Sequence, residues 1–130
     1  MNKSLIEKLS TKNILVIDDD GLITRTLCAL LKKEGYFATG TEDSSDAADK
    51  AVQENFDLII ADIRMPGMDG VEMVRKIRSD SQGLNKPQTP VVFITGYSEG
   101  EAIEEARQLG EVILKPFDTG EFLNRITKYL

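Results

Sequence analysis

The stretch "DLIIADIRMPGMDG", Asp57–Gly70, decides the fold prediction. An apolar run, Leu58 to Ala61, ends at an acid, Asp62, and a proline and two glycines follow it within a few residues. A continuous apolar run is typical of a strand that is buried on both faces, as in a parallel sheet. Asp62 at its end could cap a helix or carry out chemistry, and the rest of the chain separates these two readings.

Five apolar runs of this kind punctuate the chain: Asn13–Ile17, Tyr36–Thr39, Asp57–Ala61, Pro90–Thr95 and Glu111–Lys115. The second run is weaker than the others and is expected at an edge of the sheet. After each run, apolar residues recur at helical spacing, as Ile23, Leu27, Leu30 and Leu31 do after the first. Five repeats of strand and helix predict an α/β fold, in which helices cover both faces of a parallel sheet.

Local signals place the ends of the helices. Asp69, Ser98 and Asp118 each precede a glutamate by three residues, a pattern typical of helix starts. Gly35 and Gly110 lie where helices are expected to end. The polar segment Ser79–Pro90 is expected to be a connection between elements. The length of 130 residues is most simply that of one domain.

Composition excludes several classes of site. The chain has no histidine, which removes histidine catalysis and histidine metal ligands, and its single cysteine, Cys28, excludes an intrachain disulfide and a cysteine zinc site. Cys28 lies among apolar residues and is predicted in the core. The net charge of -6 argues against direct binding to nucleic acid. No apolar run is long enough to span a membrane, so the chain is not expected to insert into one. A cytoplasmic location is expected.

Polar residues gather where the predicted strands end. The first strand is followed by Asp18, Asp19 and Asp20, the third ends at Asp62, the fourth at Thr95 and the fifth at Lys115. Ligands of open parallel sheets bind at the carboxyl ends of the strands. Carboxylates that lie close together repel one another, and oxygen ligands alone favour Mg²⁺, with Mn²⁺ possible.

The remaining two groups suit a phosphoryl ligand. Lys115 supplies a positive charge and Thr95 a hydrogen-bond donor, so the pattern predicts phosphoryl transfer to a carboxylate. Taken singly, each residue has a simpler explanation. Asp18 and Asp19 could equally be first-turn acids of a helix, and Asp20 is better explained as a helix cap or a peripheral acid. Their joint placement on four strand ends favours the site.

Four motifs resemble the receiver domains of bacterial two-component response regulators, similar to the chemotaxis response regulator: "ILVIDDD" (Ile14–Asp20), "LIIADIRMPGMDGVEM" (Leu58–Met73), "VVFITGY" (Val91–Tyr97) and "ILKPF" (Ile113–Phe117). The resemblance covers residues 12–130 and leaves 1–11 as an N-terminal extension. It implies a doubly wound, flavodoxin-like (βα)5 fold with a five-stranded parallel sheet in the order 2-1-3-4-5.

The resemblance also implies roles for the site residues. Asp62 would accept a phosphoryl group from a phosphohistidine of a sensor histidine kinase or a histidine phosphotransfer protein. Asp19 and Asp62 would bind Mg²⁺ through their side chains, Arg64 through its backbone carbonyl, and Asp18 mostly through water. Thr95 matches the family's switch hydroxyl and Lys115 its phosphoryl-binding lysine. The peptide bond before Pro116 is expected to be cis.

The sequence departs from the family at a few positions. Val112 replaces the aromatic residue that is common three residues before the lysine, and the stretch from Gly110 to Lys115 is shorter than usual. Arg64 and Tyr97 occupy variable positions that tend to tune dephosphorylation.

Three functions are compatible with these observations. The first is a phosphorylation-dependent signalling switch, not an enzyme beyond assisting its own phosphorylation and dephosphorylation, that alters the face of Ser98–Leu130 for an unknown protein target. The alternative is a receiver-like binding module that phosphorylation does not regulate, which Val112 favours. A metal-dependent phosphatase is less favoured, because no substrate lid is visible.

Overall fold

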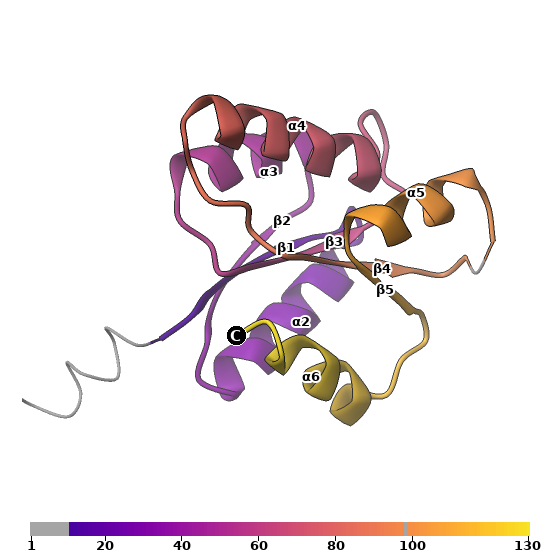
Figure 1. Ribbon diagram of the computed structural model, residues 1–130. Helices are drawn as coiled ribbons and strands as arrows, with labels where there is room; N and C mark the ends of the chain where they lie inside the picture. Colours follow the sequence, from indigo (N-terminus) through magenta and orange to yellow (C-terminus); the bar gives the residue numbers. More distant parts are fainter. Residues whose placement is uncertain (1–10, 98) are drawn as a thin grey trace, which may run out of the picture.

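Five parallel strands form one sheet in the order β2-β1-β3-β4-β5, as the family resemblance implies. The computed structural model describes residues 11–97 and 99–130. The strands are β1 (Asn13–Ile17), β2 (Phe37–Thr41), β3 (Leu58–Asp62), β4 (Val91–Thr95) and β5 (Glu111–Leu114). Because all pairings are parallel, the carboxyl ends of the strands lie along the same edge of the sheet (Figure 1).

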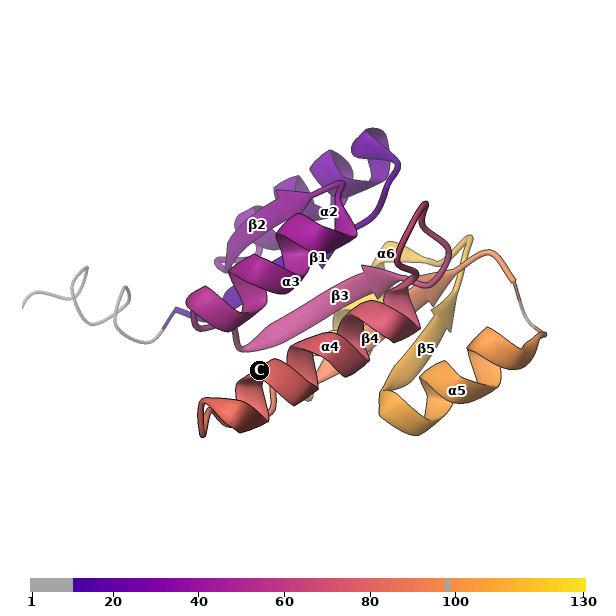
Figure 2. The same cartoon turned by 90° about the horizontal axis from the view of Figure 1, so that it is seen from above.

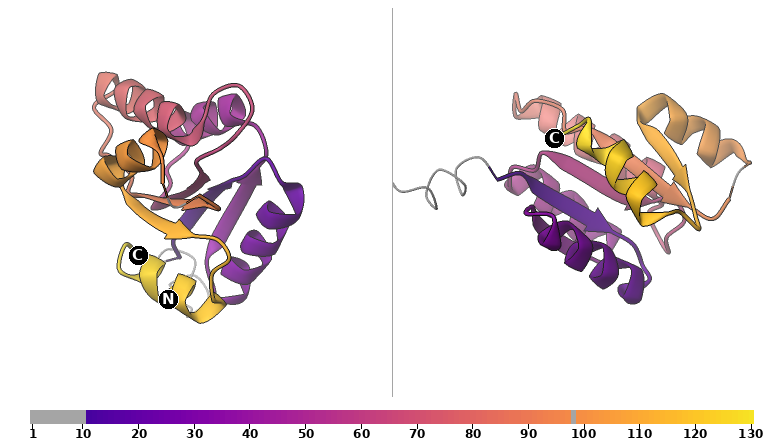
Figure 3. Two further views of the ribbon diagram at one scale, coloured as in Figure 1. Left: turned by 90° about the vertical axis from the view of Figure 1, so that its right-hand side faces the viewer. Right: turned by 90° about the horizontal axis from the view of Figure 1, so that it is seen from below.

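The described helices cover both faces of the sheet, so the fold is doubly wound. They are α2 (Gly21–Lys33), α3 (Ser44–Gln53), α4 (Gly70–Gly83), α5 (Glu101–Leu109) and α6 (Thr119–Thr127). Helices α3, α4 and α5 lie on one face (Figure 2), and α2 and α6 lie on the other (Figure 3). None of the helices in the described residues is long and apolar enough to cross a membrane.

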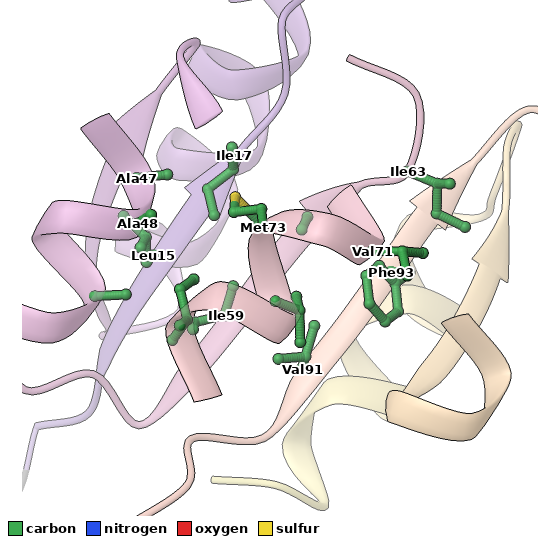
Figure 4. Close-up of a cluster of buried hydrophobic side chains, with 14 of the residues drawn as sticks. Leu15, Ile17, Ala47, Ala48, Ile59, Ile63, Val71, Met73, Val91 and Phe93 are labelled. Carbon is green, nitrogen blue, oxygen red and sulfur yellow. The ribbon is translucent and has the colours of Figure 1, made fainter. Parts of the chain in front are cut away.

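The sheet separates two buried apolar clusters. Alternate residues of the central strands, such as Leu15, Ile59 and Phe93, belong to the cluster between the sheet and helices α3, α4 and α5 (Figure 4). Their neighbours in sequence, such as Val16 and Ile60, join the cluster under α2 and α6. Burial on both faces explains why the three central strands are continuous apolar runs.

Most of the predicted helix ends are confirmed. The carboxylate of Asp20 accepts a hydrogen bond from the backbone of Leu22, and those of Asp69 and Asp118 accept one from the backbone N–H three residues later. Gly35 follows the cap of α2 with φ of 95°, and Gly110 is the cap residue of α5. Cys28 is buried in the core, as predicted.

Three predicted boundaries differ from the structure by two residues or more. Helix α5 begins at Glu101 after Gly100, whose φ of 128° suits glycine, and Ser98 itself lies outside the described residues. Helix α4 runs to Gly83 and so includes the start of the segment Ser79–Pro90, which was predicted to be a connection. The prediction failed because exposed polar residues fit the last turns of a helix as well as a connection. Strand β2 extends to Thr41, two residues further than predicted. A side chain at Gly40 would lie 2.4 Å from Thr24 of α2, so a glycine inside this strand allows the helix to approach.

Candidate functional site

Three carboxylates meet at the carboxyl edge of β1 and β3. Asp18 follows β1 and Asp62 ends β3, each one residue beyond the paired residues Ile17 and Ala61. One carboxylate oxygen from each of Asp18, Asp19 and Asp62 lies within 4.8 Å of the other two. Asp18 and Asp62 are buried, whereas Asp19 is exposed. Asp20 does not join them, because its carboxylate caps α2.

Lys115 brings one positive charge to these acids. Its Nζ lies 2.9 Å from Oδ2 of Asp18 and 3.6 Å from Oδ2 of Asp62. The ammonium therefore divides its interaction between two buried carboxylates and is closer to Asp18. Sequence reasoning placed Lys115 at the site but did not foresee that its shorter contact is to Asp18.

The site is short of positive charge. Burial raises the pKa of Asp62, and repulsion from Asp18 raises it further, while Lys115 and the backbone N–H of Arg64 lower it. The balance leaves the pKa of Asp62 at about 6. A divalent cation among the three carboxylates would relieve this repulsion, and the all-oxygen donor set fits a hard ion such as Mg²⁺.

Thr95 is fully buried at the end of β4, on the strand next to Asp62. Its Oγ1 accepts a hydrogen bond from the backbone N–H of Tyr97 at 3.2 Å, and its carbonyl accepts one from the backbone N–H of Lys115 at 2.7 Å. The Thr95 backbone thus connects β4 to the lysine that contacts the acids. The Lys115–Pro116 peptide is cis, as expected.

The turn after β3 is built by two glycines. Gly67 has φ of 75°, a conformation that glycine adopts without strain. A Cβ at Gly70 would lie 2.2 Å from the backbone oxygen of Asp62, so only glycine fits there. Gly70 also donates from its backbone N–H to the Ile63 carbonyl at 2.8 Å. The sequence analysis noted the two glycines after Asp62 but missed this role of Gly70, although a glycine opening a helix was the signal.

Two exposed side chains of the loops that follow β3 and β4, Arg64 and Tyr97, contact each other. The guanidinium of Arg64 lies 4.1 Å from the centroid of the Tyr97 ring. Arg64 stands two residues after Asp62, and Tyr97 stands two residues after Thr95. The sequence indicated each position separately, but nothing in it predicted their contact.

Comparisons with known proteins agree on one family. The family described as "Response regulator receiver domain" matches residues 14–127. Sporulation initiation phosphotransferase F of Bacillus subtilis is 31% identical over 124 residues, which cover 94% of this chain and 96% of the relative. Transcriptional regulatory protein ResD of the same organism is 32% identical over 127 residues, and this chain spans only 50% of its length.

Solved structures give the same picture. Chemotaxis protein CheY4 of Vibrio cholerae superposes with a TM-score of 0.81 at 29% identity, covering 93% of this chain and 100% of that one. Response regulator protein TrrA of Thermotoga maritima, solved in complex with Mg(2+)-BeF, gives a TM-score of 0.80 at 31% identity, covering 92% and 100% of the two chains.

Proposed function

Because this chain belongs to the response regulator receiver domain family, we propose that it is a phosphorylation-dependent signalling switch whose phosphoacceptor is Asp62. One observation carries the proposal. The Asp62 carboxylate lies at a strand end within 4.8 Å of two further acids, and Lys115 lies beside it. The receiver unit would span residues 12–130.

The proposed transfer is an attack by an Asp62 oxygen on the phosphorus of a phosphohistidine. A P–O bond forms and the P–N bond breaks, and the imidazole nitrogen keeps the electron pair and takes up a proton. The donor would be a sensor histidine kinase or a histidine phosphotransfer protein. Lys115 and the Thr95 hydroxyl would hold the transferred oxygens. The same groups would assist hydrolysis of the aspartyl phosphate by water.

The proposed cation is Mg²⁺, and Mn²⁺ would suit the same oxygens. Asp19 and Asp62 would hold it by side chain, Arg64 by its backbone carbonyl and Asp18 mainly through water. When bound, the ion offsets the negative charge that gathers on the phosphoryl oxygens during transfer. The cluster of Asp18, Asp19 and Asp62 supports this assignment.

A cavity beside the site supports docking of the phosphodonor protein. About 340 Å³ of space lies between α2 and the segment after β5, lined by Leu22, Ile23, Thr26, Leu27, Lys115, Pro116 and Phe117. Leu22 is 65% exposed, so this rim offers apolar surface next to the lysine of the site. The face that phosphorylation alters for the downstream target would be that of α5, β5 and α6. The net charge of -6 favours a protein target over nucleic acid.

One observation favours the alternative of a binding module that phosphorylation does not regulate. Val112 of β5 packs against the cluster under α5, where the family commonly has an aromatic ring. Without a ring, this position cannot report the state of Thr95 in the usual way. The two functions differ in whether Asp62 forms an adduct and whether the α5–β5–α6 face then changes.

Intact-mass spectrometry after incubation with acetyl phosphate and Mg²⁺ tests the proposal. We expect one phosphoryl adduct in the wild type, none in Asp62→Asn and none with EDTA. Asp20→Asn is the matched control, because asparagine also caps helices well and the adduct should persist. An adduct on Asp62→Asn would contradict the assignment. A folded wild type that forms no adduct with a small donor or with a kinase would favour the binding module.

A further inference from the structure

Tyr97 is held by two groups that border the proposed phosphoryl site. Its ring lies under the guanidinium of Arg64, at 4.1 Å from the centroid. Its backbone N–H donates to the hydroxyl of Thr95 at 3.2 Å. Tyr97 is 51% exposed, and Arg64 lies over one face of its ring. The ring of Tyr97 thus contacts Arg64 and its backbone N–H donates to Thr95, and a phosphoryl ligand would attract both of these partners.

The negative charge of a phosphoryl group on Asp62 would attract the Arg64 guanidinium away from the Tyr97 ring. Arg64 stands two residues after Asp62, so its long side chain begins on the loop that leaves the phosphoacceptor. A phosphoryl group adds strong acceptor oxygens and negative charge, and arginine binds such oxygens in pairs. A guanidinium on an exposed ring gains far less than it would from a charged hydrogen bond.

Lys115 leaves part of this charge unmet. Its Nζ is 0.7 Å closer to Asp18 than to Asp62, at 2.9 Å against 3.6 Å, so it serves two carboxylates already. One ammonium divided in this way does not saturate three phosphoryl oxygens. Arg64 supplies a second cation from the loop that follows Asp62.

We propose that the Arg64 side chain is a phosphoryl-binding residue that exchanges the Tyr97 ring for the phosphoryl group on Asp62. The exchange releases the ring of Tyr97. When the Thr95 hydroxyl turns to donate to the same group, the Tyr97 backbone loses its acceptor as well. Tyr97 then reports phosphorylation at the start of the segment that leads into α5. It would take over the reporting role that Val112 of β5 cannot fill without an aromatic ring. This inference rests on the proposed function, because it needs a phosphoryl group on Asp62.

Fluorine NMR of protein that carries 3-fluorotyrosine follows the ring directly. The three tyrosines give three signals, and Tyr97→Phe identifies the one from Tyr97. Beryllofluoride with Mg²⁺ serves as the stable phosphoryl analogue. We expect the Tyr97 signal to shift when the analogue binds, while Tyr36 changes little. In Arg64→Gln, the signal should already lie near its released position and move little on binding. Arg75→Gln, which removes an exposed arginine of α4, should behave like the wild type.

Binding measurements then separate an exchange from a passive stack. Arg64→Gln should weaken beryllofluoride binding about tenfold, because a charged hydrogen-bond donor is lost. Tyr97→Leu should tighten it about two- to fivefold, because the competing partner of the guanidinium is gone. A stack that only supports the loop would weaken binding in both variants, and that result would overturn the inference.

The outcomes also distinguish the two proposals. If beryllofluoride binds the wild type and Arg64→Gln equally, with the same shift of Tyr97, Arg64 has no phosphoryl-binding role while Asp62 keeps its own. If the wild type does not bind beryllofluoride or form an adduct, the proposed function fails and the exchange fails with it. Asp62→Asn shows which signal changes depend on the acceptor.

Discussion

The two ends of β5 hold opposite arrangements of charge. At the amino end, one carboxylate, Glu111, receives Nε of Arg125 at 2.8 Å, Nζ of Lys128 at 3.2 Å and the hydroxyl of Tyr129 at 2.7 Å. At the carboxyl end, one ammonium, Lys115, lies between two buried carboxylates. The first group fastens α6 to the sheet, and the second leaves negative charge uncompensated.

The pKa values follow this difference. Burial alone would raise the pKa of Glu111, but hydrogen bonds from Tyr129, Arg125 and Lys128 outweigh it and hold the pKa below its usual range. Burial and the same carboxylate raise the pKa of Tyr129 to about 12. At the other end, burial and Asp18 raise the pKa of Asp62 to about 6. A satisfied cluster stabilises a fold, whereas an unsatisfied one favours a ligand that completes it.

Removing the cation from the carboxyl end should have the largest effect. We expect Lys115→Met to weaken beryllofluoride binding by roughly a hundredfold and to lower the free energy of unfolding at pH 7.5 by about 1–3 kcal/mol, because two buried carboxylates lose their counter-charge. Titration with the analogue and urea denaturation measure the two effects. Lys128→Met at the other end is the control and should cost less than about 1 kcal/mol. Equal losses in both variants would remove the contrast.

Removing the anion from the amino end should act on stability alone. Glu111→Gln keeps the shape but removes the carboxylate that Arg125 and Lys128 share, so we expect a loss of about 1–2 kcal/mol in the free energy of unfolding. Mg²⁺ affinity should stay within twofold of the wild type. A large loss of Mg²⁺ affinity would mean that the two ends of the strand are coupled, against the separation drawn above.

The last effect needs no substitution and is the pH dependence that Asp62 contributes. Its pKa is about 6 in the folded protein against 3.8 for a free carboxyl, so the folded state binds the proton more tightly. The stability from this group is therefore present below about pH 4 and is lost as the pH rises through 6, by up to about 3 kcal/mol in metal-free protein. Urea denaturation from pH 4 to 7.5 measures it. Subtracting the Asp62→Asn curve isolates Asp62 from Glu111, and an unchanged pH slope in the mutant would contradict the assignment.

Much of this arrangement could be predicted because it rests on burial. The runs around Leu15, Ile59 and Phe93 are apolar on both faces, and that pattern has few explanations other than a parallel sheet. The fold then places Asp18 and Asp62 at the same edge without further information. Asp69 and Asp118 could be located because a cap needs only neighbours in sequence.

The missed features depend on contacts between distant residues or on permissive backbone. The stack of Arg64 on Tyr97 and the attachment of Tyr129 to Glu111 join positions that no local pattern connects. The start of α5 was misplaced because Gly100 caps it without a side chain, so there was no polar residue to recognise. The end of α4 was misplaced because exposed helical turns and connections share the same polar composition.

The contact at Gly70 bears on how such a protein can vary over generations. Asparagine has nearly the shape of each acid of the site, but any side chain at Gly70 would collide with the peptide of Asp62 itself. Natural selection would therefore act against substitutions of Gly70, which has no functional group, as strongly as against substitutions of Asp62. In a library of random substitutions, variants at this glycine should disappear together with those at the acids, and drift would accumulate in the exposed turns of α4 instead.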